Sequence, residues 1–174
     1  MAHHFSFSRH HIIITRRFTT PTTKFIASHR CLRLPPIKVL EGSNLPPILL
    51  LGGTANTIQS WIGHHNFFSK HREVFVLELR GQGKHNPELP PDDVRMEAQV
   101  KDISKFLKHI QYGEDYNRPI DIVGFSFGGR VAMAFSSEFP KSVNKIVVTG
   151  VGGDRGEMGR LIYEQWKVLL SINT

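Results

Sequence analysis

The chain has 174 residues, of which 40% are hydrophobic and 21% are charged, and its formal net charge is +7. This length and composition are those of one globular domain with a hydrophobic core. The single cysteine excludes a disulfide framework and a cysteine-based zinc site. No apolar run approaches the roughly 18 residues that a membrane span requires, so we expect no transmembrane span.

The positive charge is confined to the N-terminal part of the chain. Residues 1–40 contain seven basic residues and no acidic residue, whereas residues 41–174 contain 15 of each kind. Because the larger part is neutral, we expect no nucleic acid as a partner. Residues 1–34 have the composition of an organelle transit peptide or a disordered tail. The run from Arg16 to Thr19 is similar to a mitochondrial presequence cleavage site, which predicts a mitochondrial location, with plastid or cytoplasm as alternatives.

The ordered core is predicted over residues 35–156, because prolines cluster at positions 35, 36, 46 and 47. The apolar runs Ile37–Leu40 and Ile48–Leu51 predict two strands, the second of them buried on both faces. A short helix is predicted at Thr57–Phe68, and an alternating strand follows at Val74–Leu79.

Helices and strands continue to alternate in the second half of the chain. Asp92 and Asp93 suit the start of a helix in which apolar residues recur at helical spacing from Met96 to Ile110, and a strand follows at Ile120–Val123. A helix at Arg130–Phe139 and a strand at Val143–Val148 come next, and an amphipathic helix within residues 157–174 begins a cap region. This order predicts an α/β fold with a doubly wound, mostly parallel sheet.

The strongest motif joins the fourth predicted strand to the helix after it, and it reads Gly124-Phe125-Ser126-Phe127-Gly128. A nucleophilic serine on a sharp strand-to-helix turn takes a strained, positive φ, and only very small residues two positions before and after it avoid a clash. Gly124 and Gly128 meet that need, so the spacing predicts a nucleophile elbow with Ser126 as the nucleophile. The first amides of the following helix would point at the same place.

Four segments resemble the α/β-hydrolase superfamily in the family's order. They are the strand and loop Pro46–Thr54, the turn Glu78–Gly83, the elbow Gly124–Gly128 and the strand Val143–Thr149. The resemblance covers about residues 35 to 155 and implies the N-terminal portion of an α/β-hydrolase fold. It also implies an oxyanion hole made by the backbone amides of Thr54 and Phe127. Gly52 stands where relatives usually carry histidine, which changes how this loop is braced but leaves the Thr54 amide in place.

The catalytic base of the family has no counterpart after the elbow. The family order is serine, then acid, then histidine, yet all ten histidines lie between His3 and His109, before Ser126. Asp154 is a candidate acid, because some relatives place the acid after the corresponding strand. A turn residue in a glycine-rich stretch is the competing interpretation of Asp154.

Five histidines in the first half of the predicted core are interpreted as solvated side chains rather than as bases. They are His64, His65, His71, His85 and His109. The group around His64 has no cysteine or carboxylate at metal-ligand spacing. We therefore expect neither a metal nor another cofactor.

The leading interpretation is an α/β-hydrolase-like protein related to serine ester or thioester hydrolases, acting on a small or lipophilic acyl substrate. As given, the chain lacks the full triad, so carboxylesterase or thioesterase activity is expected only if the chain is completed. The alternative is a non-catalytic protein that binds a partner or a ligand. Self-association through the exposed edge of the strand Val143–Val148 would be one form of such binding.

Overall fold

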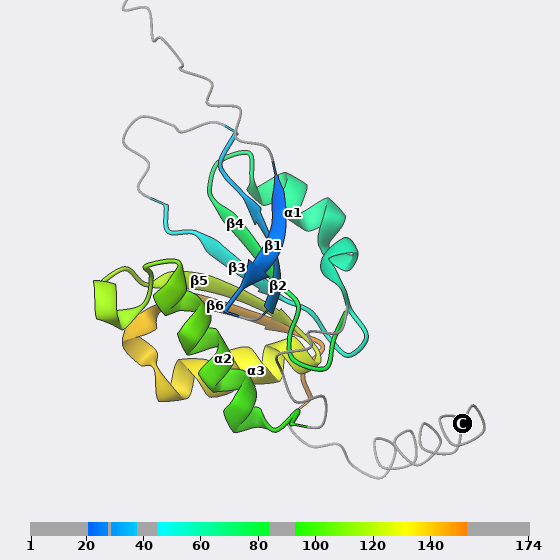
Figure 1. Cartoon of the computed structure of the whole chain (residues 1–174), viewed down its shortest axis with the longest axis vertical. Coiled ribbons are helices and arrows are strands. Elements are labelled where there is room, and N and C mark those ends of the chain that lie inside the picture. Colours follow the sequence, from blue (N-terminus) through cyan, green and yellow to red (C-terminus); the bar gives the residue numbers. More distant parts are fainter. Residues whose placement is uncertain (1–20, 28, 38–44, 84–92, 153–174) are drawn as a thin grey trace, which may run out of the picture.

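The computed structural model describes residues 21–27, 29–37, 45–83 and 93–152. They form a six-stranded sheet with helices on both faces (Figure 1). No helix in these described residues is long and apolar enough to cross a membrane.

The strands are β1 (Thr22–Ile26), β2 (His29–Leu34), β3 (Ile48–Leu51), β4 (Val74–Leu77), β5 (Ile120–Phe125) and β6 (Val143–Thr149). The α-helices are α1 (Ile62–Phe68), α2 (Met96–His109) and α3 (Phe127–Glu138), and the 3-10 helices are η1 (Ile58–Trp61), η2 (Glu114–Tyr116) and η3 (Pro140–Ser142). The strand order is β1-β2-β4-β3-β5-β6, in which β1 and β2 pair antiparallel, β2 and β4 also pair antiparallel, and every other pair is parallel. The predicted doubly wound, mostly parallel α/β sheet is confirmed.

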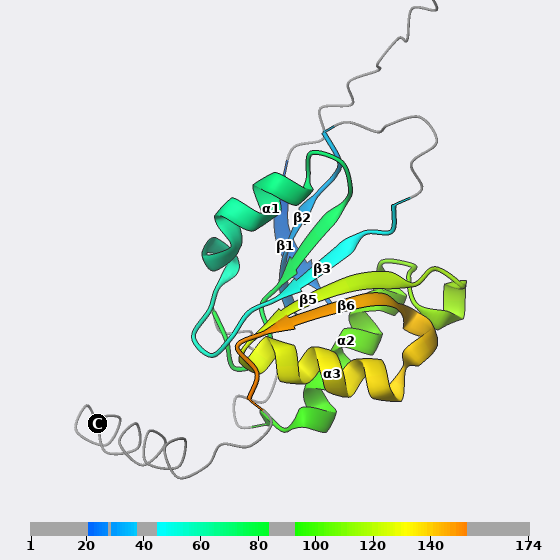
Figure 2. The same ribbon diagram turned by 180° about the vertical axis from the view of Figure 1, so that it is seen from behind.

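Helices α2 and α3 cover one face of the sheet, and η1 with α1 covers the other (Figures 1 and 2). Phe75 and Phe106 meet edge to face on the first side, with ring centroids 5.6 Å apart. Trp61 is buried on the second side. Strand β3 lies between the two layers, because Leu49 belongs to the first cluster and Leu50 to the second. This burial on both faces explains the continuous apolar run.

The predicted boundary between tail and core is wrong for residues 22–34. These residues form β1 and β2, and Cys31 and Leu34 of β2 are buried in the two core clusters. Residues 1–20 lie outside the described residues, so the transit peptide and the mitochondrial location stay predictions.

The physical reason for this error lies in the basic side chains of β2. Arg30 pairs with Glu78 at 3.0 Å, and Arg33 pairs with Glu73 at 2.6 Å. Both acidic partners flank β4, the neighbour of β2 in the sheet. Side chains that looked like part of a targeting segment therefore belong to cross-strand ion pairs, and a run of residues taken alone does not reveal such partners.

Other element boundaries shift by a turn or less. The predicted helix at 57–68 is a 3-10 turn followed by α1, and α3 begins at Phe127 rather than at Arg130 because the elbow leads straight into it. Ile37 is not in a strand, and the rest of that predicted strand lies outside the described residues, as does the predicted helix within 157–174.

A buried polar cluster ties α2 to the turn after β4. Asp102 of α2 accepts two hydrogen bonds from the Arg80 guanidinium, at 2.8 and 2.9 Å. His29 Nε2 lies 3.1 Å from the same carboxylate, although it has no hydrogen-bond partner among the described residues. The Gln99 side chain accepts from the Arg80 backbone N–H at 3.2 Å and donates to its carbonyl oxygen at 3.0 Å. The cluster therefore holds Arg80 by both its main chain and its side chain.

The ion pair sets the pKa of Asp102. Burial by itself raises this pKa, but the contacts with His29 and Arg80 outweigh burial and lower it from 3.8 to about 2. Because the folded-state pKa lies below the unfolded value, the stabilising contribution is present above about pH 4 and is lost as pH falls toward 2.

We predict that Asp102→Asn lowers the free energy of unfolding by about 3 kcal/mol at pH 7, because it leaves the Arg80 cation largely buried without a counter-charge. The difference between the variant and the original chain should shrink below about pH 4. Urea unfolding across this pH range measures the difference. Asp115→Asn is the matched control, because Asp115 forms an exposed pair with Lys108. A difference that stays constant down to pH 2 would contradict the assignment.

Candidate functional site

Ser126 lies between β5 and α3, at the end of the sheet where the parallel strands terminate. Its backbone φ is 52° and its ψ is −114°. A positive φ is strained for any residue with a side chain, and it persists only where neighbours hold it. The Ser126 N–H donates to the carbonyl oxygen of Thr149 at 2.8 Å, and the Arg130 N–H donates to the Ser126 carbonyl oxygen at 3.2 Å. Hydrogen bonds on both sides therefore hold the predicted turn.

Two glycines allow the backbone segments around Ser126 to approach each other. A Cβ built on Gly124 would lie 2.6 Å from the carbonyl oxygen of Gly128. A Cβ on Gly128 would overlap the carbonyl oxygens of Leu51 and Gly52. All of these neighbouring atoms are backbone atoms, which cannot rotate away. The motif therefore has a steric basis in β3, β5 and α3 together.

The loop after β3, residues 52–56, lies directly against Ser126. A Cβ built on Gly53 would be 3.0 Å from the Ser126 Cβ. The Gly53 N–H donates to Asn56 Oδ1 at 2.7 Å, and a Cβ on Gly52 would be 2.7 Å from the Asn56 Cβ. The Asn56 side chain thus occupies the space next to Gly52, the position at which relatives usually carry histidine. Its hydrogen bond to Gly53 stabilises this loop. We call residues 52–56 the oxyanion loop, after the role that the sequence resemblance predicts for Thr54.

The two amides that the sequence predicted as oxyanion donors lie on either side of this contact. Thr54 follows Gly53 in the oxyanion loop, and Phe127 follows Ser126 as the first residue of α3. Within the part of the chain that the structure describes, neither amide N–H has a hydrogen-bond acceptor. Their role as oxyanion donors stays a prediction, and no acceptor in the described residues competes for either N–H group.

The two phenylalanines of the elbow have different surroundings. Phe125 is 44% exposed, and its ring lies against Gly53 and Gly150, where a Cβ would be 3.1 and 3.0 Å away. Phe127 instead packs against the core under α2 and α3. Of the two, Phe125 is the more exposed and offers apolar surface beside Ser126.

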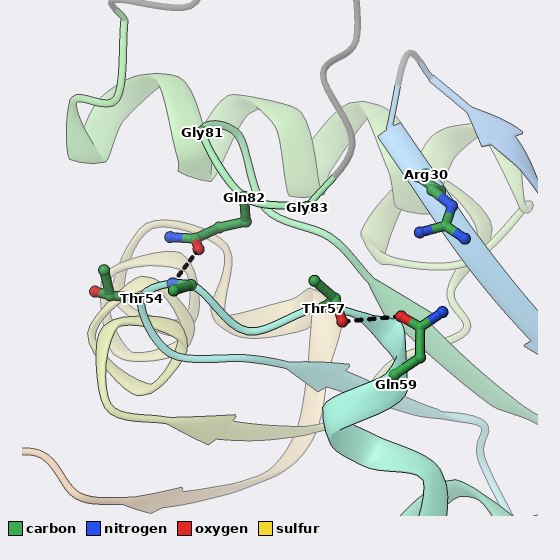
Figure 3. A pocket seen from close by; sticks show the side chains of 8 residues that line it. Arg30, Thr54, Thr57, Gln59, Gly81, Gln82 and Gly83 are labelled. Atoms are coloured by element: carbon green, nitrogen blue, oxygen red, sulfur yellow. Dashed lines mark hydrogen bonds between the residues drawn. The ribbon is translucent and has the colours of Figure 1, made fainter. Parts of the chain in front are cut away.

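A pocket of about 630 Å³ opens beside the oxyanion loop (Figure 3). Its lining consists of Arg30, Thr54, Ala55, Thr57, Gln59, Gly81, Gln82 and Gly83. Figure 3 shows the turn 81–83 facing the oxyanion loop across this pocket, with Gln82 reaching the backbone of Ala55. Thr54 lines the pocket and directly follows Gly53, which lies against Ser126, while Ser126 itself is not part of the lining. Sequence reasoning missed Gln82 and Asn56, although their places beside recognised glycine turns were a usable signal.

The sequence model of the alpha/beta hydrolase fold matches residues 46–167, which is more than half of the chain. This chain belongs to the alpha/beta hydrolase family. An uncharacterized protein of Mycobacterium tuberculosis is 30% identical over 138 residues, which cover 79% of this chain and 37% of the relative. The human monoacylglycerol lipase ABHD6 is 27% identical over 109 residues, which cover 62% of this chain and 31% of the lipase. The chain therefore spans only about a third of the length of these relatives.

Solved structures confirm the fold. An alpha/beta hydrolase enzyme from a deep-sea metagenome superposes with a TM-score of 0.67 at 19% identity, over 83% of this chain and 49% of that enzyme. Structures of comparable similarity include both an esterase and epoxide hydrolases. Because one fold carries these different reactions, the reaction has to be argued from the residues of the site.

No histidine of this chain is joined to Ser126 by a hydrogen bond among the described residues. His29 does contact a carboxylate, that of Asp102, but it is 2% exposed. It lies on β2, which is three strand spacings from β5, or about 14 Å. His65 is also buried, so the prediction that it is a solvated side chain is wrong, and burial lowers the pKa of its imidazole. His29 and His65 are therefore core residues rather than bases.

Asp154, the predicted candidate acid, and His85, which was predicted to be a solvated side chain, lie outside the described residues. Among the described residues, no group of three or more His, Cys, Asp or Glu side chains is arranged to hold a metal ion.

We predict that Gly128→Ala destabilises the chain by on the order of 4 kcal/mol, because the new methyl group meets immovable carbonyl oxygens of β3 and the oxyanion loop. Gly63→Ala in α1 is the matched control, since a Cβ there meets nothing within 4 Å. The control should be neutral or more stable by up to about 1 kcal/mol, as alanine favours helices. Urea unfolding compares the two, and equal effects would show that the elbow is not sterically constrained.

Proposed function

We propose that Ser126 is the nucleophile of a hydrolase that cleaves esters or thioesters of small or lipophilic acyl groups. The observation that carries this proposal is the positive φ of Ser126 at the β5–α3 turn, with the oxyanion loop packed against it. A serine held in this way exposes its hydroxyl above the sheet. A hydroxyl in place of a carboxylate at this position favours attack on an acyl carbonyl.

The proposed reaction uses the groups around the elbow in fixed roles. Ser126 Oγ bonds to the acyl carbon, and the carbonyl oxygen takes the negative charge. The N–H groups of Thr54 and Phe127 hold this oxygen by hydrogen bonds. Collapse of the intermediate releases the alcohol or thiol, which takes up the proton that Ser126 lost, and water then hydrolyses the acyl-serine.

An apolar acyl group is supported by the surface beside the serine. Phe125 exposes 44% of its side chain there and lies against the oxyanion loop. One relative is named a monoacylglycerol lipase, so a lipophilic acyl chain is chemically consistent with this surface.

The proton acceptor for Ser126 is not identified in these residues. No histidine follows Ser126 in the sequence, and Asp154 is proposed as the acid only from its place shortly after β6. Removing one member of a triad lowers the rate by several powers of ten, because the members act as a unit. We therefore propose that the chain as given reacts slowly.

We predict slow labelling of these 174 residues by a fluorophosphonate probe, at a rate several powers of ten below that of an esterase with a complete triad. In this reaction Ser126 Oγ displaces fluoride from phosphorus and its proton passes to solvent. Mass spectrometry after long incubation should find the label on Ser126, and Ser126→Ala should abolish it. Fast labelling would reveal a base within the chain, whereas labelling that persists in Ser126→Ala would contradict the proposed nucleophile.

Binding through the sheet edge is a second candidate function, because β6 exposes apolar residues. Ile146, Val147 and Val148 are 38%, 57% and 39% exposed. Within the described residues β6 pairs only with β5, so its other edge offers free backbone N–H and carbonyl groups (Figure 2). We propose that a second copy of the chain pairs with this edge.

We predict that the chain forms a dimer in solution and that Val147→Lys weakens it, because a charge on an edge strand opposes strand pairing. Size-exclusion chromatography with light scattering over a range of concentrations measures this. Ile62→Lys is the matched control, since Ile62 is a similarly exposed aliphatic residue on α1, away from β6. A compact monomer at every concentration would rule out self-association.

A further inference from the structure

We propose that Gln82 is a positioning residue for the oxyanion hole. Together with Asn56, it occupies the amides on either side of Thr54, so that the Thr54 N–H is left as the donor of the oxyanion loop. This inference rests on the proposed role of Ser126. It attributes the orientation of the Thr54 amide to two side chains, Asn56 and Gln82, that lie outside the elbow.

The three successive amides of the oxyanion loop have different partners. The Gly53 N–H donates to Asn56 Oδ1 at 2.7 Å, and the Ala55 N–H donates to Gln82 Oε1 at 2.5 Å (Figure 3). The Thr54 N–H between them has no acceptor among the residues that the structure describes. Two side-chain oxygens thus satisfy the flanking donors and leave the middle one free.

Ala55 needs an external partner to keep its conformation. Its φ is 62°, in the left-handed region that an alanine disfavours. The Asn56 N–H bonds back to the Gly53 carbonyl oxygen at 3.1 Å, which closes the turn around Ala55. The hydrogen bond from the Ala55 N–H to Gln82 Oε1 ties this turn to the turn after β4. Without it, we expect Ala55 to relax toward a negative φ and the Thr54 amide to rotate with it.

Gln82 lies in the turn 81–83, whose backbone conformation is fixed by its own contacts. Gly81 and Gly83 have φ values of 77° and 65°, and the Gln82 N–H donates to the Leu79 carbonyl oxygen at 2.9 Å. A Cβ on Gly83 would overlap the buried Glu78 carboxylate, so the turn packs closely on β4.

The residue before this turn is anchored to α2. Arg80 is bound through its backbone by Gln99 and through its guanidinium by Asp102. The Gln82 side chain therefore extends from a backbone segment that is held in place. A rigid acceptor of this kind orients a neighbouring amide before any substrate binds.

The chain provides a matched pair of substitutions to test this role. Gln82→Met keeps the length of the side chain and removes the acceptor. Gln59→Met makes the same change in the same pocket, where the Gln59 side chain accepts, among the described residues, a hydrogen bond only from the Thr57 hydroxyl. Gln82→Ala is the second variant if Gln82→Met does not fold, and circular dichroism with a thermal melt verifies folding of each.

The first measurement is amide hydrogen exchange of Ala55 by NMR on the whole chain. We expect exchange to be at least tenfold faster in Gln82→Met than in the original chain, and unchanged in Gln59→Met. Unchanged exchange of Ala55 in Gln82→Met would overturn the positioning role. This readout does not depend on whether Ser126 reacts.

The second measurement is the rate at which the fluorophosphonate probe labels Ser126, since its P=O oxygen would occupy the oxyanion hole. Loss of one oxyanion donor lowers rates by about 100- to 1,000-fold, so a displaced donor should slow labelling by roughly 10- to 100-fold in Gln82→Met. Gln59→Met should label at the original rate. An unchanged rate in Gln82→Met overturns the inference and leaves the nucleophile intact. Absence of any Ser126 label in the original chain contradicts the proposed function instead, and the exchange measurement then still decides whether Gln82 holds the loop.

Discussion

The close approach of three backbone segments around Ser126 is the constraint on which the site depends. Gly128 at the start of α3 lies against the carbonyl oxygens at the end of β3, and Gly124 of β5 lies against the first turn of α3. Glycine is needed at both places because the space that a Cβ would fill is already occupied by backbone atoms. This packing places Gly53 against Ser126, so one steric arrangement forms both the sharp turn and the oxyanion loop beside it.

A second line of contacts reaches the same loop from α2. It runs from α2 through Asp102 to Arg80, and from the turn after Arg80 through Gln82 to Ala55. Because the ion pair is largely buried, loss of the Asp102 carboxylate would leave the Arg80 guanidinium without a counter-charge and would strongly destabilise the fold. The helix that covers the core is thereby connected to the conformation of a loop at the end of the sheet. The buried contact between Asp102 and Arg80 therefore contributes both to the stability of the fold and to the position of Gln82 beside the oxyanion loop.

Residues on the two edges of the sheet have contrasting surroundings. The N-terminal edge is closed by the hairpin β1–β2, whose arginines pair with acidic residues flanking β4. The other edge, β6, is 38 to 57% exposed at Ile146, Val147 and Val148. The relatives are considerably longer than this chain. A second copy of the chain bound at β6 would cover the apolar side chains that β6 exposes.

The sequence by itself determined the family, the parallel alternation of strands and helices, and the elbow at Ser126, because apolar periodicity and glycine spacing are local signals. It failed at residues 22–34, where the partners of Arg30 and Arg33 lie more than 35 residues away. It also left open how the oxyanion loop is held, since Gln82 meets Ala55 only after β3 and β4 have paired. Only the tertiary structure decided these points, because a hydrogen bond between distant residues has no pattern in the chain until the fold brings them together.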